Sequence, residues 1–232
     1  MKFSAIITAG GTSSRFGNTN KLLEKIDGKE IIRHTVDAFV KASIEDIVIC
    51  ANVSIISILS DIFADYKNVR IIEGGTTRQE SVYNGLQAVD CDYVLIHDGA
   101  RPMITSEIIK KTMDEVVEKK AVSVMTKTVD TIKKVDENGK IITTIDRTQL
   151  YNTQTPQAFE YSLIKEVHEK YKGLNFTDDA GMVEEFGKDV YIVEGDYRNI
   201  KVTTKSDLAL VKIYLNKCKN MLQKWGFLKS KQ

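Results

Sequence analysis

The chain has 232 residues, of which 42% are hydrophobic and 28% charged, a composition typical of a globular protein with a single domain over residues 1–232. The formal net charge of +1 gives no electrostatic reason to expect a nucleic-acid partner, and no apolar run is long enough to predict a membrane span. The three cysteines are scattered and lack metal-ligand spacing, which is typical of reduced thiols. We therefore expect a cytoplasmic protein that binds neither nucleic acid nor membrane.

The first predicted element is a short buried strand, residues 5–7, which runs into a glycine-rich loop. Gly10 and Gly11 allow the backbone to approach a ligand closely, and successive N–H groups in such a loop suit phosphate oxygens. Arg15 and Lys21 add positive charge beside the loop. The pattern predicts a polyphosphate site, with an ordinary strand-to-helix turn as the alternative. The glycine spacing matches neither a Walker loop nor a dinucleotide-binding fingerprint.

Strands and helices then alternate as far as residue 119. The predicted strands are residues 46–50, 69–72 and 92–96, and the predicted helices are residues 29–42, 55–63, 78–89 and 105–119. This alternation predicts an α/β fold with a Rossmann-like, mostly parallel, twisted sheet and helices on both faces. Ligands bind beyond the carboxyl ends of such strands. We therefore expect the glycine-bearing loops after residues 7, 72 and 96 to meet at one edge.

The alternation breaks at Ala121. A strand at residues 122–125 is followed by two β-rich runs, 131–135 and 140–145, which flank Asn138-Gly139. Asn-Gly between such runs is a strong hairpin signal. Because an isolated two-stranded hairpin is marginal in water, we expect a protruding β-hairpin arm, at about residues 127–150, that packs on another subunit in a homodimer.

The remaining predicted elements return to the helix and strand pattern. Helices are predicted at residues 162–171, 181–186 and 206–219, and strands at residues 190–194 and 200–202. Thr177-Asp178-Asp179-Ala180 has the composition of a helix N-cap ahead of the second of these helices.

The loop at residues 8–17 resembles the signature of nucleotidyltransferases that activate sugars and polyol phosphates. Seven further blocks narrow the resemblance: residues 74–82, 97–102, 129–131, 146–147, 154–157, 177–180 and 199–203. These blocks follow one another in the order of the 2-C-methyl-D-erythritol 4-phosphate cytidylyltransferases and span about residues 5–207. The resemblance implies the fold of the nucleotide-diphospho-sugar transferases, and the transfer of a cytidylyl group from CTP to methylerythritol phosphate with release of pyrophosphate.

The resemblance also implies the catalytic residues. Arg15 and Lys21 would contact the triphosphate, and Lys201 would lie near the α-phosphate. Asp98 would bind Mg²⁺, a cation that takes few protein carboxylates and completes its shell with phosphate oxygens and water. From the residues alone, solvated lysines and a turn-capping aspartate stay open as alternatives. His97 is expected to orient Asp98 or to pack, because the sequence suggests no nucleophilic constellation.

The resemblance further implies how both substrates are held. The nucleotide-binding set is Ala9, Gly10, Gly11, Gly75, Thr76 and Ser81. Arg101 and Thr155 would hold the polyol phosphate, and Thr177 is either a pocket residue or a cap. Thr131 and Arg147, on or beside the arm, would complete the pocket of the neighbouring subunit. A simple N-cap is the alternative role for Ser81.

The sequence departs from the family pattern at Thr12, Phe16, Asn20 and Leu22, which leaves the course of the first loop open. Two other functions stay open as well. The first is a ribitol 5-phosphate cytidylyltransferase, which shares the fold and most motifs. The second is a noncatalytic nucleotide sensor, against which the retained charges of Arg15, Lys21, Asp98 and Lys201 argue.

Overall fold

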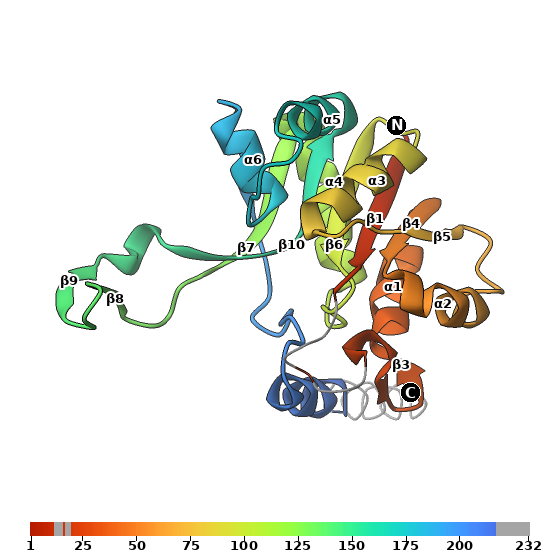
Figure 1. Cartoon of the computed structure of the whole chain (residues 1–232), viewed down its shortest axis with the longest axis horizontal. Coiled ribbons are helices and arrows are strands. Elements are labelled where there is room, and N and C mark those ends of the chain that lie inside the picture. Colours follow the sequence, from red (N-terminus) through yellow and green to blue (C-terminus); the bar gives the residue numbers. More distant parts are fainter. Residues whose placement is uncertain (12–15, 17–19, 217–232) are drawn as a thin grey trace, which may run out of the picture.

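The computed structural model describes residues 1–11, 16 and 20–216, and in these residues seven strands form one central sheet (Figure 1). In order across the sheet, the strands are β11 (Tyr191–Glu194), β7 (Ala121–Lys127), β10 (Tyr151–Glu160), β6 (Tyr93–Asp98), β1 (Phe3–Ala9), β4 (Asp46–Ala51) and β5 (Val69–Glu73). Strand β10 is antiparallel to both of its neighbours, and the other pairings are parallel. The predicted mostly parallel sheet is confirmed.

Helices cover both faces of this sheet (Figure 1). They are α1 (Ile31–Lys41), α2 (Ile56–Ile62), α3 (Arg78–Ala88), α4 (Ser106–Lys119), α5 (Tyr161–Lys170) and α6 (Asp179–Glu185), and residues 205–216 are also helical. Helices α1, α2 and α4 share a hydrophobic core with one face, whereas α3, α5 and α6 share a core with the other. The α/β arrangement predicted from the alternating pattern is therefore present.

Strand β1 lies near the centre of the sheet and shows why strands of this sheet appear in the sequence as continuous runs of apolar residues. Ala5 and Ile7 belong to one core and Ile6 to the other, each with 0% of its surface exposed. Because both faces are covered, neither needs polar residues, and each buried isoleucine stabilises the fold by about 1.5–3 kcal/mol. The chain passes from β1 to β4 on one side and later returns to β6 on the other. A ligand crevice is expected where the order reverses, beyond the carboxyl ends of β1 and β6.

Three segments differ from the sequence-based prediction. Residues 29–30 form β3, which pairs with β2 (Lys25–Ile26), so α1 begins only at Ile31. Strand β10 contains Pro156, a residue that argues against a strand, and no strand is predicted there; the register of its pairing shifts around this proline. The strand expected at residues 200–202 is a loop, because its backbone hydrogen-bonds to the loop after β6 rather than to a neighbouring strand.

The predicted hairpin arm is present and protrudes from the sheet (Figure 1). Its strands, β8 (Ile132–Val135) and β9 (Ile141–Ile145), pair antiparallel. The turn is closed by Asp136, whose Oδ1 accepts backbone N–H groups from Asn138 and Lys140, while Gly139 has a φ of +81° that favours glycine. Apolar side chains lie exposed along the arm: Val129, Val135, Ile141 and Ile142 are each more than half exposed.

Candidate active site

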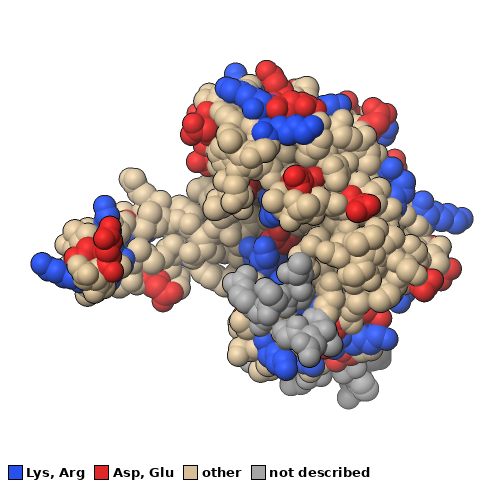
Figure 2. Space-filling view, in the orientation of Figure 1, with Lys and Arg blue, Asp and Glu red and all other residues tan. Residues whose placement is uncertain are grey.

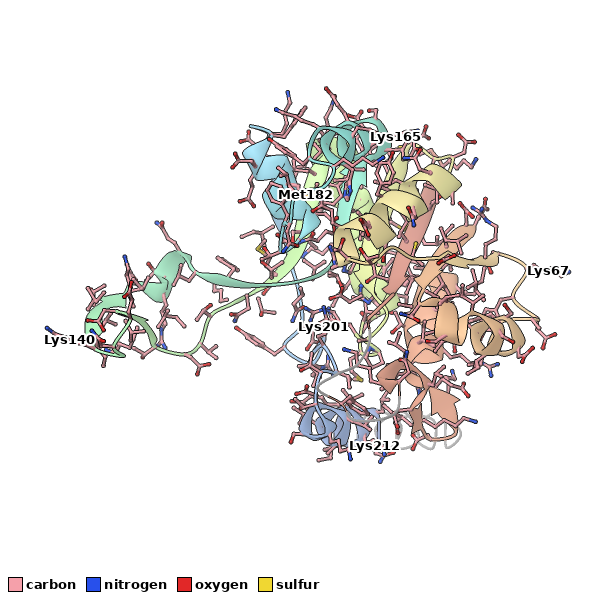
Figure 3. All side chains as sticks on the ribbon, viewed as in Figure 1. Lys67, Lys140, Lys165, Met182, Lys201 and Lys212 are labelled. Atoms are coloured by element: carbon pink, nitrogen blue, oxygen red, sulfur yellow. The ribbon has the colours of Figure 1, made fainter. Side chains whose placement is uncertain are left out.

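A cavity of about 370 Å³ opens at the carboxyl ends of β1 and β6. The loop after β1, the start of α3, the end of β6 with Asp98, and the loop with Lys201 before the last helical segment line it. Figure 2 shows basic and acidic side-chain atoms meeting in a hollow at the centre of this face. Figure 3 places Lys201 at this edge of the sheet, between the arm and the first strands. The expected convergence of the glycine-bearing loops is confirmed.

Asp98 is the last residue of β6 and is 6% exposed. Its Oδ2 lies 2.9 Å from Lys201 Nζ and 3.5 Å from Arg101 Nε, and its Oδ1 lies 3.4 Å from Arg78 Nε. Burial alone would raise the pKa of this carboxyl, but the charges of the three cations hold the pKa well below its usual range. Asp98 is therefore an anion at neutral pH, at the centre of a positively charged site.

Parallel pairing of β1 and β6 sets the position of Asp98. Thr8 is its register partner, and Thr8 Oγ1 lies 3.4 Å from Asp98 Oδ1. The next residue, Gly99, donates its N–H to the Thr8 carbonyl at 3.0 Å, and a Cβ on Gly99 would lie only 3.0 Å from the same oxygen. A side chain on residue 99 would therefore crowd the Thr8 carbonyl, and glycine fits here without displacing it. The carboxylate is held at the strand end by backbone geometry.

His97 packs behind Asp98 and supports it. The imidazole has 0% of its surface exposed, and burial lowers its pKa to about 3, so the ring is neutral at physiological pH. Thr155 Oγ1 accepts the Asp98 backbone N–H at 3.1 Å and lies 2.9 Å from His97 Nδ1. Because His97 Nε2 faces the Arg101 carbonyl, which can only accept, the neutral ring carries its hydrogen on Nε2, and Nδ1 accepts from the Thr155 hydroxyl. The expectation that His97 orients Asp98 or packs, rather than acting as a base, agrees with these contacts.

Thr155 and Arg101, the residues expected to hold the polyol phosphate, both make hydrogen bonds to other residues of the protein. Thr155 is 5% exposed, and its hydroxyl is engaged as described above. Arg101 Nη1 donates to the Asn199 carbonyl at 2.8 Å, and Asn199 Nδ2 donates to the Thr155 carbonyl at 2.9 Å. Together with the hydrogen bond from Val202 N–H to the carbonyl of residue 100, these contacts hold the loop that carries Lys201.

The loop after β5 brings the predicted nucleotide-binding residues together. Ser81 Oγ accepts the Gly75 N–H at 3.0 Å and donates to the Thr77 carbonyl at 2.8 Å. A Cβ on Gly75 would lie 2.1 Å from the Cβ of Glu80, so only glycine fits. Thr77, rather than Ser81, caps α3, which removes the N-cap alternative for Ser81. A Cβ on Gly10 would lie 3.0 Å from Ser81 Oγ, so the first loop packs closely against this one.

Lys21 lines the cavity at the start of a short 3₁₀ helix, Lys21–Leu23. Asn20 caps this helix, because its side chain accepts the Leu22 N–H at 3.0 Å, and Leu22 is 3% exposed in the core. The departures at Asn20 and Leu22 are thus accommodated by a cap and a core contact. Arg15 and Thr12 lie outside the described residues.

The substrate residues expected on the arm lie apart from this cavity. Thr131 and Arg147 are exposed, and Arg147 Nη1 donates to the Val129 carbonyl within the arm. Thr177 is also exposed and precedes α6, whose cap is Asp178. None of the three lines this cavity.

Two residues with no role in the sequence-based prediction belong to the site. Arg78, the first residue of α3, lines the cavity and joins Asp98 to Asp179, its Nη1 lying 2.8 Å from Asp179 Oδ2. Arg78 falls within the block at residues 74–82 and Asp179 within the block at residues 177–180, so the family resemblance was the signal that could have identified them. Asp179 has 0% of its surface exposed and is 3.1 Å from His168 Nε2.

In the described part of the chain, no helix is long and apolar enough to cross a membrane, and no three His, Cys, Asp or Glu side chains are grouped to hold a metal ion.

Comparison with known proteins gives one consistent family. The family described as IspD, 2-C-methyl-D-erythritol 4-phosphate cytidylyltransferase, matches residues 3–217. A protein of that name from Clostridium botulinum (strain 657 / Type Ba4) is 43% identical over 225 residues, 93% of this chain and 98% of its own. Another protein of that name, from Clostridioides difficile (strain 630), is 40% identical over 92% of this chain and 94% of its own. The crystal structure of 4-diphosphocytidyl-2C-methyl-D-erythritol synthase from Anaerococcus prevotii DSM 20548 superposes with a TM-score of 0.83 at 35% identity, covering 93% of this chain and 98% of that one.

Proposed function

This chain belongs to the 2-C-methyl-D-erythritol 4-phosphate cytidylyltransferase family, and we propose that the cavity around Asp98 is where it performs the family's reaction. The enzyme transfers a cytidylyl group from CTP to 2-C-methyl-D-erythritol 4-phosphate, a step of the non-mevalonate isoprenoid pathway. The observation that carries the site is the convergence of Lys21, Lys201 and Asp98 beside two glycine loops in one cavity.

The chemistry that this arrangement supports is in-line transfer with little covalent participation by the protein. A phosphate oxygen of the acceptor attacks the α-phosphorus of CTP, and the bond to pyrophosphate breaks. Catalysis then depends on positioning and on stabilising the charge that develops on the phosphate oxygens. In our proposal Lys21 and Arg15 neutralise the triphosphate and the leaving pyrophosphate, and Lys201 stabilises charge at the α-phosphate.

The nucleotide would lie across the two glycine loops. In our proposal the backbone of Ala9, Gly10 and Gly11 faces the phosphates and ribose. Gly75 and Thr76 face the base, and Ser81 acts by orienting the Gly75 peptide, since its hydroxyl is already bonded to that N–H.

Asp98 is the residue proposed to hold Mg²⁺. Among the described residues, its Oδ1 has only long contacts, 3.4 Å to Arg78 Nε and 3.4 Å to Thr8 Oγ1. A small hard cation would therefore displace the fewest existing contacts by binding this oxygen. Held by Asp98, Mg²⁺ would supply positive charge that neutralises part of the charge on the nucleotide phosphates. The residues present fit such an ion because one charged carboxylate faces a cavity large enough for phosphates.

We propose a homodimer in which the arm completes the acceptor site of the partner subunit. The exposed apolar side chains of the arm and the distance of Thr131 and Arg147 from their own cavity support this. Arg101, Thr155 and Thr177 stay proposed acceptor residues. The single-domain organisation and the cytoplasmic location expected from the sequence stay predictions.

Pyrophosphate release tests the proposal directly. The protein is assayed with each of the four nucleoside triphosphates, against 2-C-methyl-D-erythritol 4-phosphate and against ribitol 5-phosphate. Release with CTP and the methylerythritol phosphate is expected. Turnover with ribitol phosphate alone would overturn the acceptor assignment, and no release with either would favour a noncatalytic nucleotide sensor.

A further inference from the structure

We propose that Asp179 is a positioning residue for this reaction: it holds the Arg78 guanidinium away from Asp98 Oδ1, so that this oxygen stays open to the divalent cation of the nucleotide. The inference rests on the magnesium site proposed above. It concerns a residue on α6 that takes no part in lining the cavity and acts only through Arg78.

The distances around Arg78 show which carboxylate controls it. Arg78 Nη1 lies 2.8 Å from Asp179 Oδ2, whereas Nε lies 3.4 Å from Asp98 Oδ1. The short charge-assisted contact is the stronger one. Arg78 is thus held mainly by Asp179 and makes only a long contact with Asp98. Its flexible side chain could come closer to Asp98 if the contact with Asp179 were lost.

Asp179 is itself rigidly held. Its side chain has 0% exposed surface, its Oδ1 accepts from His168 Nε2 at 3.1 Å, and its backbone N–H donates to Gln157 Oε1 at 3.1 Å. Burial alone would raise the pKa of Asp179, but the charge of Arg78 and the bond from His168 lower it. The buried group is therefore an anion that can balance a full positive charge.

The two oxygens of Asp98 are consequently unequal. Oδ2 is engaged by Lys201 at 2.9 Å, while the two contacts of Oδ1 described above are both 3.4 Å. If Arg78 closed on Oδ1, both oxygens would be paired with cations, and an incoming Mg²⁺ would have to displace one of them. Within the described residues, Arg78 Nη2 is also buried without a hydrogen-bond partner, so the guanidinium is not otherwise restrained on that side.

The test measures CTP binding by titration calorimetry in the absence of the acceptor, so that no turnover occurs, at a series of Mg²⁺ concentrations. Asp179→Asn keeps the shape of the side chain but removes its charge. The Mg²⁺ concentration that gives half-maximal binding should rise about tenfold, the effect of one charge-assisted hydrogen bond. Arg78→Gln removes the cation instead, so its midpoint should stay at or below the wild-type value even if CTP binds more weakly.

Asp46→Asn is the matched control. Asp46 pairs with Arg70 Nη2 at 2.6 Å, but it begins β4, at the amino-terminal end of a strand parallel to β1 and away from the cavity, and its loss should leave the midpoint unchanged. A midpoint for Asp179→Asn within twofold of wild type would overturn the inference. A raised midpoint for Arg78→Gln would overturn it as well, and this second measurement tests the inference even if Asp179→Asn does not fold. If CTP binding to the wild-type protein did not depend on the Mg²⁺ concentration, the metal assignment itself would be overturned, and this inference with it.

Discussion

Replacing Lys201 by alanine should reduce kcat about 100-fold while leaving the fold intact. Two unit charges 4 Å apart interact by about 4 kcal/mol at an effective dielectric constant of about 20, and this sets the scale for the attraction between charge on the α-phosphate and Lys201 in the cavity. Its side chain is 39% exposed, so solvent would screen part of this energy. A loss of about 2.7 kcal/mol in transition-state stabilisation, equal to about a 100-fold decrease in kcat, is the scale seen when one preorganised donor is removed.

The assay is steady-state pyrophosphate release at saturating CTP and acceptor, with the melting temperature measured alongside. Lys205→Ala is the matched control, because Lys205 is an exposed lysine four residues further along the same segment and should leave kcat unchanged. A Lys201→Ala enzyme with kcat within threefold of wild type would refute the proposed role. Lys201→Arg should recover part of the rate, since it restores the charge.

Three more outcomes are expected. Ser81→Ala should raise the KM for CTP about tenfold, because the Gly75 N–H loses its partner; an unchanged KM would mean that this peptide does not orient the base. Arg147→Met should raise the KM for the acceptor more than that for CTP if the arm completes the partner's site, and equal changes would contradict it. Asp98→Asn should flatten the acid side of the curve of melting temperature against pH. The folded-state pKa of Asp98 is depressed, so its stabilisation is present above about pH 4 and is lost as the pH falls toward the folded value; a parallel curve for the variant would count against this.

Local sequence determined much of the fold. Continuous apolar runs such as residues 5–7 predict strands buried on both faces, and Asn138-Gly139 predicts the hairpin, because these depend only on neighbouring residues. Gly75 is similar, since the atom that excludes a side chain there belongs to Glu80, five positions away. The positions of the glycine loops and of Asp98 could be predicted because each lies at the carboxyl end of a strand, whereas their roles came from the family resemblance.

The rest was decided by contacts between distant residues. Strand β10 was not predicted, because Pro156 opposes a strand locally while pairing with two neighbours stabilises one. The bond from Thr155 to His97 joins residues 58 positions apart, and the pair of Arg78 with Asp179 joins residues 101 positions apart. No periodicity or spacing encodes such pairs. The sequence by itself, through the family resemblance, indicated Lys21, Asp98 and Lys201 as charged groups of the cavity, but not Arg78. Only the tertiary structure decided which carboxylate each cation pairs with, because the pairing depends on which side chains the folded sheet and helices bring within hydrogen-bonding distance.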